Sequence, residues 1–497
     1  RRDALEQRVA IVDLARAGRR GHHLIAAGRE IFLTGNTTQH RIVIVGGGAG
    51  GLELAVRLGN ILGKKQHASI TLIDAARTHL WKPLLHQVAA GTMDNHADEL
   101  EYFALAQVNH FNFRLGRMEA LDRTKKEIFI APTLDENGEE LLPRQAIQYD
   151  TLVMAIGSQT NDFGTPGARE NSIMLDSTEA AVRFNEKLIN SCIRAQANQK
   201  GFGEGRFTVT IIGGGATGVE LSAELHMTTK ILSSYGFANI HPEKDLKIVI
   251  VDAAPRLLPV LPEKVSAAVA LELRKIDVEI HTNEKVVEVS KQGVQMASGK
   301  FIPSGLVVWA AGIKAPDFLA NIGGLETNRL NQLVVHKTLQ TTRDTSIFAM
   351  GDCAACPQDE GKPNVPPRAQ AAHQQAMMMA KTLQKRLAGK PLPEFSYHDH
   401  GSLVSLGEYS TVGALMGGLR SGELFIEGKF AKWMYWSLYK KHQVAINGWF
   451  RTWLITWAPW RRALCRSALV TTVQITAPLE IPLPPLLYLQ PATGIMW

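Results

Sequence analysis

Two glycine-rich segments are the parts of this sequence whose residue types and spacing most directly suggest chemistry. Glycine in such a segment allows a tight turn and lets a pyrophosphate approach the backbone at the N-terminus of the following helix. One segment of this kind is a weak signal, whereas two in similar surroundings predict that one chain holds two dinucleotides. Both have the pattern Gly-x-Gly-x-x-Gly, with Gly46, Gly48 and Gly51 in the first and Gly213, Gly215 and Gly218 in the second.

The residues around each pattern supply a strand, a turn and a helix. Apolar β-branched runs at 41–45 and 208–212 lead into the glycines, and helix-like stretches follow them. An acid closes the next strand in each unit, Asp74 and then Asp252, where a carboxylate accepts from a ribose hydroxyl. Asp252 favours NADH because it would repel a 2′-phosphate, although Arg256 leaves NADPH open. Two unrelated glycine loops are the weaker alternative.

Strand and helix patterns alternate along the chain, which predicts an α/β fold with two Rossmann-like dinucleotide-binding domains. Buried-strand runs that end in Gly157 and Gly312 close the two units. The second domain is expected at 163–304, inserted into a first domain that is split around it.

Composition and charge argue against several other classes of protein. The net charge of +7 comes without a basic block that has the features of a nucleic-acid module, so no nucleic-acid partner is predicted. The four cysteines favour a reducing compartment over a disulfide framework, and no metal site is predicted. No stretch of about 18 apolar residues lacks charge and proline, so a spanning helix is not expected. Residues 1–40 do not match a signal peptide.

Over residues 41–455 the chain closely resembles the bacterial type II NADH:quinone oxidoreductases, which are single-subunit flavoproteins with two dinucleotide-binding domains. The resemblance implies that the first glycine pattern holds FAD and the second holds NADH. It also implies hydride transfer from NADH to FAD, then transfer of two electrons to a membrane quinone without proton pumping, which feeds the respiratory chain. The segments that carry the resemblance are 41–54, 80–86, 149–158, 213–224, 309–316, 351–353 and 368–374.

The resemblance assigns residues to each cofactor site. The implied FAD ligands are Gly46, Gly48, Gly51, Asp74, Lys82, Gly157 and Asp352. The implied NADH ligands are Gly213, Gly215, Gly218, Asp252 and Gly312. Trp81 is expected at the wall of the flavin site, with plain core packing as the alternative.

The sequence patterns and the resemblance together suggest a division of the chain. The expected parts of the chain are an N-terminal extension without an assigned role (1–40), an FAD-binding domain in two parts (41–162 and 305–400), an NADH-binding domain (163–304), a membrane-associating region (401–462) and a divergent tail that we expect to be disordered (463–497).

Related enzymes differ in where the electrons leave. Disulfide reductases carry a redox-active cysteine pair near the flavin, and residues 52–191 contain no cysteine, which excludes that route. Cys353 and Cys356 have thioredoxin-like spacing but follow the flavin-binding turn, so a structural role is favoured, with metal binding or redox sensing left open. A sulfide:quinone oxidoreductase, which needs sulfur-relaying cysteines, and a non-enzymatic signalling flavoprotein are the alternatives.

The quinone-side motif of the family matches residues 369–374. Gln370 and Gln374 are four residues apart on one helix face, with His373 beside them, so their donors could reach a quinone oxygen as it gains negative charge. A polar face exposed to water is the alternative. Glu220 matches an acid near the junction of nicotinamide and flavin, and it is predicted to position the nicotinamide or relay protons. A favourable contact with the helix dipole is the alternative for Glu220.

Residues 428–462 have the composition of a helix that lies on a membrane surface. Six of the nine tryptophans occur there, with several Lys and Arg and only Glu427 nearby. We therefore expect an anionic membrane surface as a partner and a peripheral location on the cytoplasmic face of the bacterial inner membrane, with a core-packing helix as the alternative. By analogy with the family, a homodimer is left open. At helical spacing one face carries Trp449, Trp453, Trp457 and Trp460.

Overall fold

The computed structural model describes residues 39–94, 99–135, 137–197, 207–234, 245–407, 411–416, 423–454 and 456. The chain divides into two compact units, Arg1–Leu438 and Tyr439–Trp497. Of the predicted extension over 1–40 only the last two residues are described, and the predicted tail over 463–497 lies outside the described residues.

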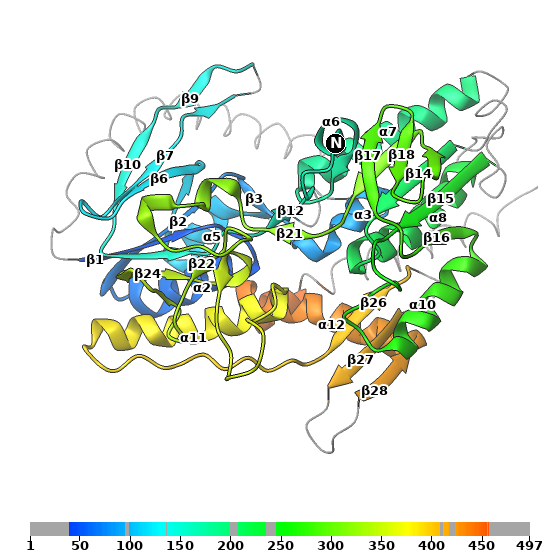
Figure 1. Ribbon diagram of the computed structural model, residues 1–497. Helices are drawn as coiled ribbons and strands as arrows, with labels where there is room; N and C mark the ends of the chain where they lie inside the picture. Colours follow the sequence, from blue (N-terminus) through cyan, green and yellow to red (C-terminus); the bar gives the residue numbers. More distant parts are fainter. Residues whose placement is uncertain are drawn as a thin grey trace, which may run out of the picture. The chain divides into compact units, whose positions relative to one another are not determined.

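The first sheet has six strands in the order β23-β24-β11-β1-β2-β5. Figure 1 labels β1, β2 and β24 of this sheet. All neighbouring pairs are parallel except β23-β24 at the edge. The central strands are almost fully buried and apolar, as expected for parallel strands covered on both faces. The strands are β1 (His40–Val45), β2 (Ala68–Asp74), β5 (Asn112–Leu115), β11 (Thr151–Met154), β23 (Gln340–Thr341) and β24 (Asp344–Ala349), and the associated helices are α2 (Ala49–Leu58) and α11 (Ala369–Leu387).

The second sheet has five parallel strands in the order β13-β20-β14-β15-β16. It lies in sequence between β11 and β24, so the first sheet is built from two separated parts of the chain. Its last strand in sequence, β20, begins after residue 304, where the second domain was predicted to end. Its elements are β13 (Ile173–Met174), β14 (Phe207–Ile212), β15 (Leu246–Val251), β16 (Val278–His281) and β20 (Leu306–Trp309), with helices α7 (Thr178–Ala197), α8 (Ala216–Ser234) and α10 (Glu263–Lys275).

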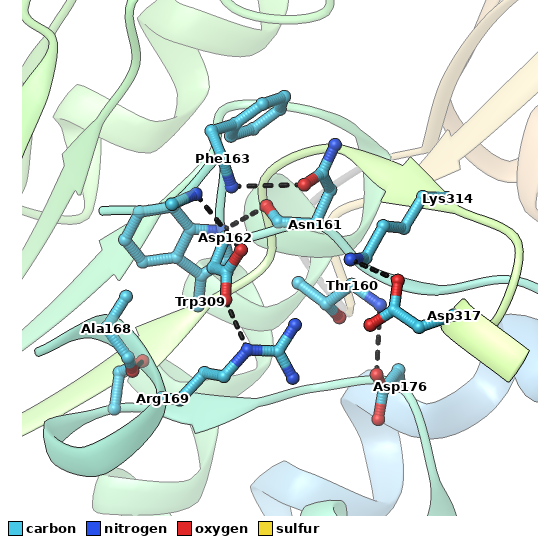
Figure 2. Close-up of polar contacts among 12 residues, drawn as sticks. Thr160, Asn161, Asp162, Phe163, Ala168, Arg169, Asp176, Trp309, Lys314 and Asp317 are labelled. Carbon is cyan, nitrogen blue, oxygen red and sulfur yellow. Dashed lines mark hydrogen bonds and ion pairs between the residues drawn. The ribbon is translucent and has the colours of Figure 1, made fainter. Parts of the chain in front are cut away.

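Two connections between the sheets run side by side. β12 (Gln159–Thr160) and β21 (Ile313–Lys314) pair antiparallel, and Figure 2 shows the polar contacts around them. The indole of Trp309 donates to the carbonyl oxygen of Asn161 at 3.0 Å, which ties the end of β20 to the first connection. The ion pairs drawn there are Asp162–Arg169 and Lys314–Asp317.

Helix α3 (Leu85–Ala90) follows the first two strands in sequence but packs in the core of the second sheet. Its buried Leu85 and Val88 belong to the same hydrophobic cluster as Phe184 of α7 and Leu221 of α8. Thr228 of α8 donates to the carbonyl oxygen at the end of α3 at 2.6 Å. Residues 41–162, predicted as one part of the FAD-binding domain, therefore contribute to both cores.

The remaining described elements are smaller. Three-stranded sheets contain β6 (Met118–Asp122), β7 (Glu127–Ile130) and β10 (Gln145–Gln148); β17 (Val286–Ser290), β18 (Gly293–Met296) and β19 (Phe301–Pro303); and β26 (Ser402–Ser405), β27 (Thr411–Met416) and β28 (Glu423–Glu427). Two-stranded pairs are β3 (Thr78–His79) with β4 (Leu100–Glu101), β8 (Thr133–Leu134) with β9 (Glu140–Leu142), and β22 (Leu333–Val334) with β25 (Ala354–Ala355). Short helices are α5 (Tyr102–Asn109) and α6 (Ala168–Asn171), with single turns at Gly59–Gly63, Lys82–Leu84, Asp317–Leu319, Ile322–Gly324 and Gly351–Cys353.

Helix α12 (Gly428–Asn447) follows β28. It ends before Gly448, whose φ of +76° is the left-handed conformation that glycine adopts after a helix. Within the part of the chain that the structure describes, no helix has the length and apolar character needed to cross a membrane.

Candidate active site

The two glycine turns have the same geometry. The backbone N–H of Gly46 donates to Ile73 at 2.8 Å, and that of Gly213 donates to Val251 at 2.8 Å. Their φ angles are +103° and +114°, which L-residues with a side chain rarely adopt. A Cβ on Gly46 would lie 2.5 Å from the carbonyl oxygen of Ala155, so glycine is required there for two reasons. The repeated sequence pattern is therefore a repeated structure.

The second glycine of each turn faces open space. A Cβ on Gly48 or Gly215 would meet no atom within 4 Å. Gly48 is the N-cap of α2, and no side chain caps that helix. Free backbone N–H groups at a helix N-terminus and room beside them are what a pyrophosphate needs, so both turns fit a dinucleotide. The third glycines, Gly51 and Gly218, differ because a Cβ there would strike the carbonyl oxygens of Gly46 and Gly213.

The two predicted acids lie beside these turns. Asp74 accepts from Gly47 N–H at 2.6 Å, and Asp252 accepts from the equivalent Gly214 N–H. Burial raises the pKa of Asp74, and its backbone hydrogen bonds partly offset this effect. Each carboxylate is thus held at the end of its strand, next to the open space.

Arg256 does not point its charge at that space. Its guanidinium donates to the carbonyl oxygens of Pro259 at 3.0 Å and Leu261 at 2.8 Å. These bonds hold the guanidinium against the backbone of residues 259–261, which weakens the NADPH alternative.

Other predicted FAD ligands gather at the ends of β11 and β24. Ser158 Oγ donates to Asp352 at 2.7 Å, and Lys82 Nζ donates to the carbonyl oxygen of Ser158 at 2.5 Å. The Lys82 side chain is exposed overall, but protein atoms surround its ammonium group. Loss of water around this group lowers the pKa of Lys82, and the nearby carboxylate of Asp352 partly offsets the shift. A Cβ on Gly157 would meet nothing within 4 Å, so this turn too is open.

Gly312, predicted on the NADH side, lies in the connection at β21. Its φ is +65°, and a Cβ there would strike the ring of Phe163. Asn161 N–H donates to its carbonyl oxygen at 3.3 Å. Trp81 is partly buried.

Glu220 is buried in α8 at 6% exposure and faces groups from three other elements. Its carboxyl accepts from Ser405 N–H at 3.0 Å and from the hydroxyl of Tyr435 in α12. His86 Nδ1 of α3 lies 3.5 Å from the second oxygen. Burial raises the pKa of Glu220 to about 8, and the neighbouring carboxylate of Glu224 adds to the shift.

His86 stays neutral in this setting. Burial lowers its pKa to about 4, and its Nε2 is buried without a hydrogen-bond partner among the described residues. Because Glu220 is protonated and His86 uncharged at neutral pH, their contact is not an ion pair. Neither His86 nor Tyr435 was predicted as a site residue; the position of His86 within the matching segment 80–86 was the one available signal.

The predicted quinone-side residues lie on α11. Gln370 Nε2 donates to Asp399 at 3.1 Å, and Gln374 Nε2 donates to the carbonyl oxygen of His398 at 2.7 Å. His373 Nδ1 lies 2.6 Å from the carboxylate of Glu53 in α2. Glu53 was not predicted from the sequence, although a carboxylate within an apolar helix was a signal for it.

Burial keeps the thiols of Cys353 and Cys356 protonated and therefore poorly reactive. Cys353 and Cys356 are free and buried. Burial raises their pKa values to about 12 and about 11, so both are thiols at neutral pH. No group of three or more metal-ligating side chains occurs among the described residues. This environment favours the structural role expected for the pair.

Comparison with known proteins places these features in a family. Residues 40–376 match the model of the pyridine nucleotide-disulphide oxidoreductases. A type II NADH:quinone oxidoreductase of Haemophilus influenzae is 45% identical over 426 residues, which cover 83% of this chain and 96% of that protein. The chain belongs to the type II NADH:quinone oxidoreductase family. The Ndh enzyme of Mycobacterium tuberculosis is a more distant member, 27% identical over 85% of this chain and 87% of its own length.

Solved structures share the fold of this family member. NDH2 from Plasmodium falciparum in complex with NADH has a TM-score of 0.69 at 19% identity, and it covers 84% of this chain and 97% of that one. The sulfide:quinone oxidoreductase of Aquifex aeolicus has a TM-score of 0.63 at 20% identity, with 82% and 92% coverage. These similarities confirm the predicted α/β fold with two dinucleotide-binding domains.

Proposed function

We propose that this protein oxidises NADH and reduces a quinone, with FAD as the cofactor between them. The observation that carries the proposal is the pair of open glycine turns, one at each sheet, each with a carboxylate fixed beside it. The family's name gives the reaction, and the two turns supply the two dinucleotide sites that this reaction needs.

The residues of the chain bind and orient the two dinucleotides. Gly48 with Asp74 would hold FAD, while Gly215 with Asp252 would hold NADH, in each case with the pyrophosphate at a helix N-terminus. Bound FAD would supply a hydride acceptor for NADH and a two-electron donor for the quinone. Asp352 and Lys82, which share Ser158, lie at the first sheet and would contact the flavin side.

Glu220 would relay protons near the junction of nicotinamide and flavin. It is buried, protonated at neutral pH and in contact with α3, so it can donate a hydrogen bond or give up a proton where water is excluded. The alternative from sequence, a contact with the helix dipole alone, does not account for its partners from three other elements.

The test of this function is anaerobic mixing of the purified protein with NADH and then with a short-chain quinone. NADH should bleach the flavin absorbance, and the quinone should restore it within the turnover time. A flavoprotein that only signals would be reduced but reoxidised slowly. A sulfide:quinone enzyme would be reduced by sulfide rather than by NADH.

We expect NADH to be preferred over NADPH by at least about tenfold in kcat/KM, because Asp252 repels a 2′-phosphate and Arg256 is held by backbone carbonyls. The check is steady-state kinetics with both nucleotides and one acceptor. Comparable kcat/KM values would mean that Asp252 does not meet the ribose.

The C-terminal residues support binding to a membrane surface. In the first compact unit Trp433 and Trp436 of α12 are 61% and 45% exposed. In the second unit Trp449, Phe450 and Trp453 are 77%, 69% and 46% exposed. Exposed aromatic rings beside Lys and Arg favour the lipid headgroup region. Trp457, Trp460 and the two arginines after them lie outside the described residues. The cytoplasmic face of a bacterial inner membrane would give a membrane quinone a route to the site.

Replacing Trp433 and Trp436 together with serine should weaken binding to anionic vesicles by about tenfold, because about 25 cal/mol is lost per square ångström of apolar surface. Substitution tests this better than truncation, since α12 also carries Tyr435, which binds Glu220. Co-sedimentation at moderate salt is the measurement. Val260→Ser is the matched control, because Val260 is 76% exposed on the second domain. Equal binding of the double variant and the control would rule out these tryptophans as anchors.

A further inference from the structure

Glu53 is a buried carboxylate that the reaction described so far does not use. It lies in α2 two residues after Gly51, and it is 1% exposed. A buried carboxylate is costly unless it is paired, and the Glu53 carboxylate lies 2.6 Å from His373 Nδ1 of α11. The residue next to the FAD-side glycine turn is thus bonded to the helix on the quinone side.

Close packing of the two helices makes this bond possible. α2 and α11 pack against each other (Figure 1). A Cβ on Gly50 would lie 3.1 Å from the carbonyl oxygen of Ala372 and 2.6 Å from the side chain of Met350. Glycine at position 50 therefore lets α2 approach α11 closely enough for Glu53 to reach His373.

The two glutamines of the motif are occupied elsewhere. The amide oxygen of Gln370 accepts from His400 N–H at 3.2 Å, and its nitrogen donates to Asp399 and Gly401. Gln374 accepts from and donates to the backbone of His398, at 3.0 Å and 2.7 Å. Both amides thus hold the segment 398–401 against α11.

His373 differs from them. Its side chain is 23% exposed, and its Nδ1 faces the buried Glu53. Among the described residues its Nε2 has no hydrogen-bond partner. A carboxylate beside Nδ1 orients the ring, and when both ring nitrogens carry a proton, Nδ1–H donates to that carboxylate and Nε2–H is an oriented donor.

We propose that Glu53 is the positioning residue for His373, and that His373 Nε2–H donates a proton to the quinone oxygen, while Gln370 and Gln374 clamp the segment 398–401. This inference rests on the proposed quinone reduction. The overall reaction is NADH + H⁺ + quinone → NAD⁺ + quinol. The hydride of NADH accounts for two electrons and one proton. The second proton passes from His373 to the quinone oxygen, and water returns a proton to His373.

The experiment compares two acceptors in the FAD-loaded protein. Ferricyanide takes electrons without protons, whereas decylubiquinone takes both. Glu53→Gln keeps an oxygen acceptor of the same shape and removes the charge, and His373→Gln removes the donor ring. We expect each variant to lower decylubiquinone reduction by about tenfold or more and to change ferricyanide reduction by less than about twofold, as for loss of an acid catalyst. Free imidazole should partly rescue His373→Ala.

Glu279→Gln is the matched control, because Glu279 also lies beside an imidazole, that of His281, at 2.5 Å on the second sheet. It should leave both activities unchanged. ¹⁵N-histidine NMR gives a readout other than activity: the deshielded Nδ1–H signal that His373→Gln removes should also be lost in Glu53→Gln. If Glu53→Gln does not fold, the comparison of the two acceptors is made with His373→Gln, because His373 is partly exposed and its replacement should be tolerated.

The outcomes separate the two levels of the proposal. Equal losses with both acceptors would mean that the pair only ties α2 to α11, and unchanged quinone reduction would remove any role for it. Either result overturns this inference and leaves the proposed function standing. If the unmodified protein reduces ferricyanide but not quinone with NADH, the proposed function fails and this inference fails with it.

Discussion

Gly215→Val is expected to lower kcat/KM for NADH by roughly 100-fold, equivalent to about 2.7 kcal/mol of transition-state stabilisation, while FAD stays bound. The reason is the open space at Gly215, where no atom lies within 4 Å of an added Cβ. Valine fits that space in the free protein but fills the volume where a pyrophosphate would lie. Steady-state kinetics with ferricyanide and the flavin absorbance of the purified protein measure the two effects separately.

Gly48→Val is the matched variant at the other turn, where the added Cβ is equally unobstructed and φ is −61°. This variant should fold but fail to bind FAD, and without FAD it should not oxidise NADH. Gly51→Val tests the contrast, since a Cβ there strikes the carbonyl oxygen of Gly46 and should prevent folding rather than binding. If Gly215→Val loses FAD and Gly48→Val keeps it, the assignment of the two turns is reversed.

Glu220→Gln is expected to lower NADH:quinone turnover by roughly 100-fold, because a buried general acid contributes that much or more. The same substitution is expected to stabilise the protein above pH 6.5. A residue with only a structural role would show the opposite pattern, with lower stability and little loss of turnover. Stopped-flow traces of flavin reduction and reoxidation would show which half-reaction is slowed.

The sign of the stability effect follows from the pKa shift. The pKa of Glu220 rises from 4.5 to about 8 in the folded state, so between these values the unfolded chain releases a proton that the folded protein keeps. Stability therefore falls as pH rises through this range. His86 acts in the other direction, since its pKa falls from 6.5 to about 4, and its contribution is lost as pH drops below 6.5. Above pH 6.5 His86 is mostly neutral in both states, so the change in stability comes mainly from Glu220.

From pH 6.5 to 8 the Glu220 carboxyl should cost the folded protein about 2 kcal/mol, at 1.36 kcal/mol for each unit of pH. Urea denaturation of the FAD-bound protein at both pH values, with and without Glu220→Gln, gives the difference. Glu279→Gln should behave like the unmodified protein, because the pKa of Glu279 is lowered and it stays ionised in both states. Identical pH dependence of all three proteins would mean that Glu220 is ionised in the folded state.

The sequence predicted the two glycine turns and the acids beside them because their chemistry is local. A turn that needs φ near +100° and a strand that ends in a carboxylate each depend on a few consecutive residues. The same local signals predicted the α/β fold and the two-part first sheet. Family membership could be predicted because the matching segments lie at these turns.

Contacts between distant segments could not be read in this way. Glu53 and His373 are 320 residues apart, and the sequence around either residue does not predict their contact. Placement of α3 in the core of the second sheet, which brings His86 to Glu220, depends on packing against α7 and α8 rather than on the pattern of α3 itself. For the same reason the predicted division at 162 and 304 followed sequence order and not the two cores.

What the sequence by itself determined is therefore the chemistry that a short stretch of backbone can impose: two dinucleotide turns, their carboxylates and the aromatic, basic C-terminal segment. The tertiary structure alone decided the charge states and the partners. Glu220 is protonated because folding removes it from water, and Gln370 and Gln374 are occupied because the segment 398–401 folds back onto α11. Burial and long-range hydrogen bonds exist only once the chain has closed on itself, and no local pattern encodes them.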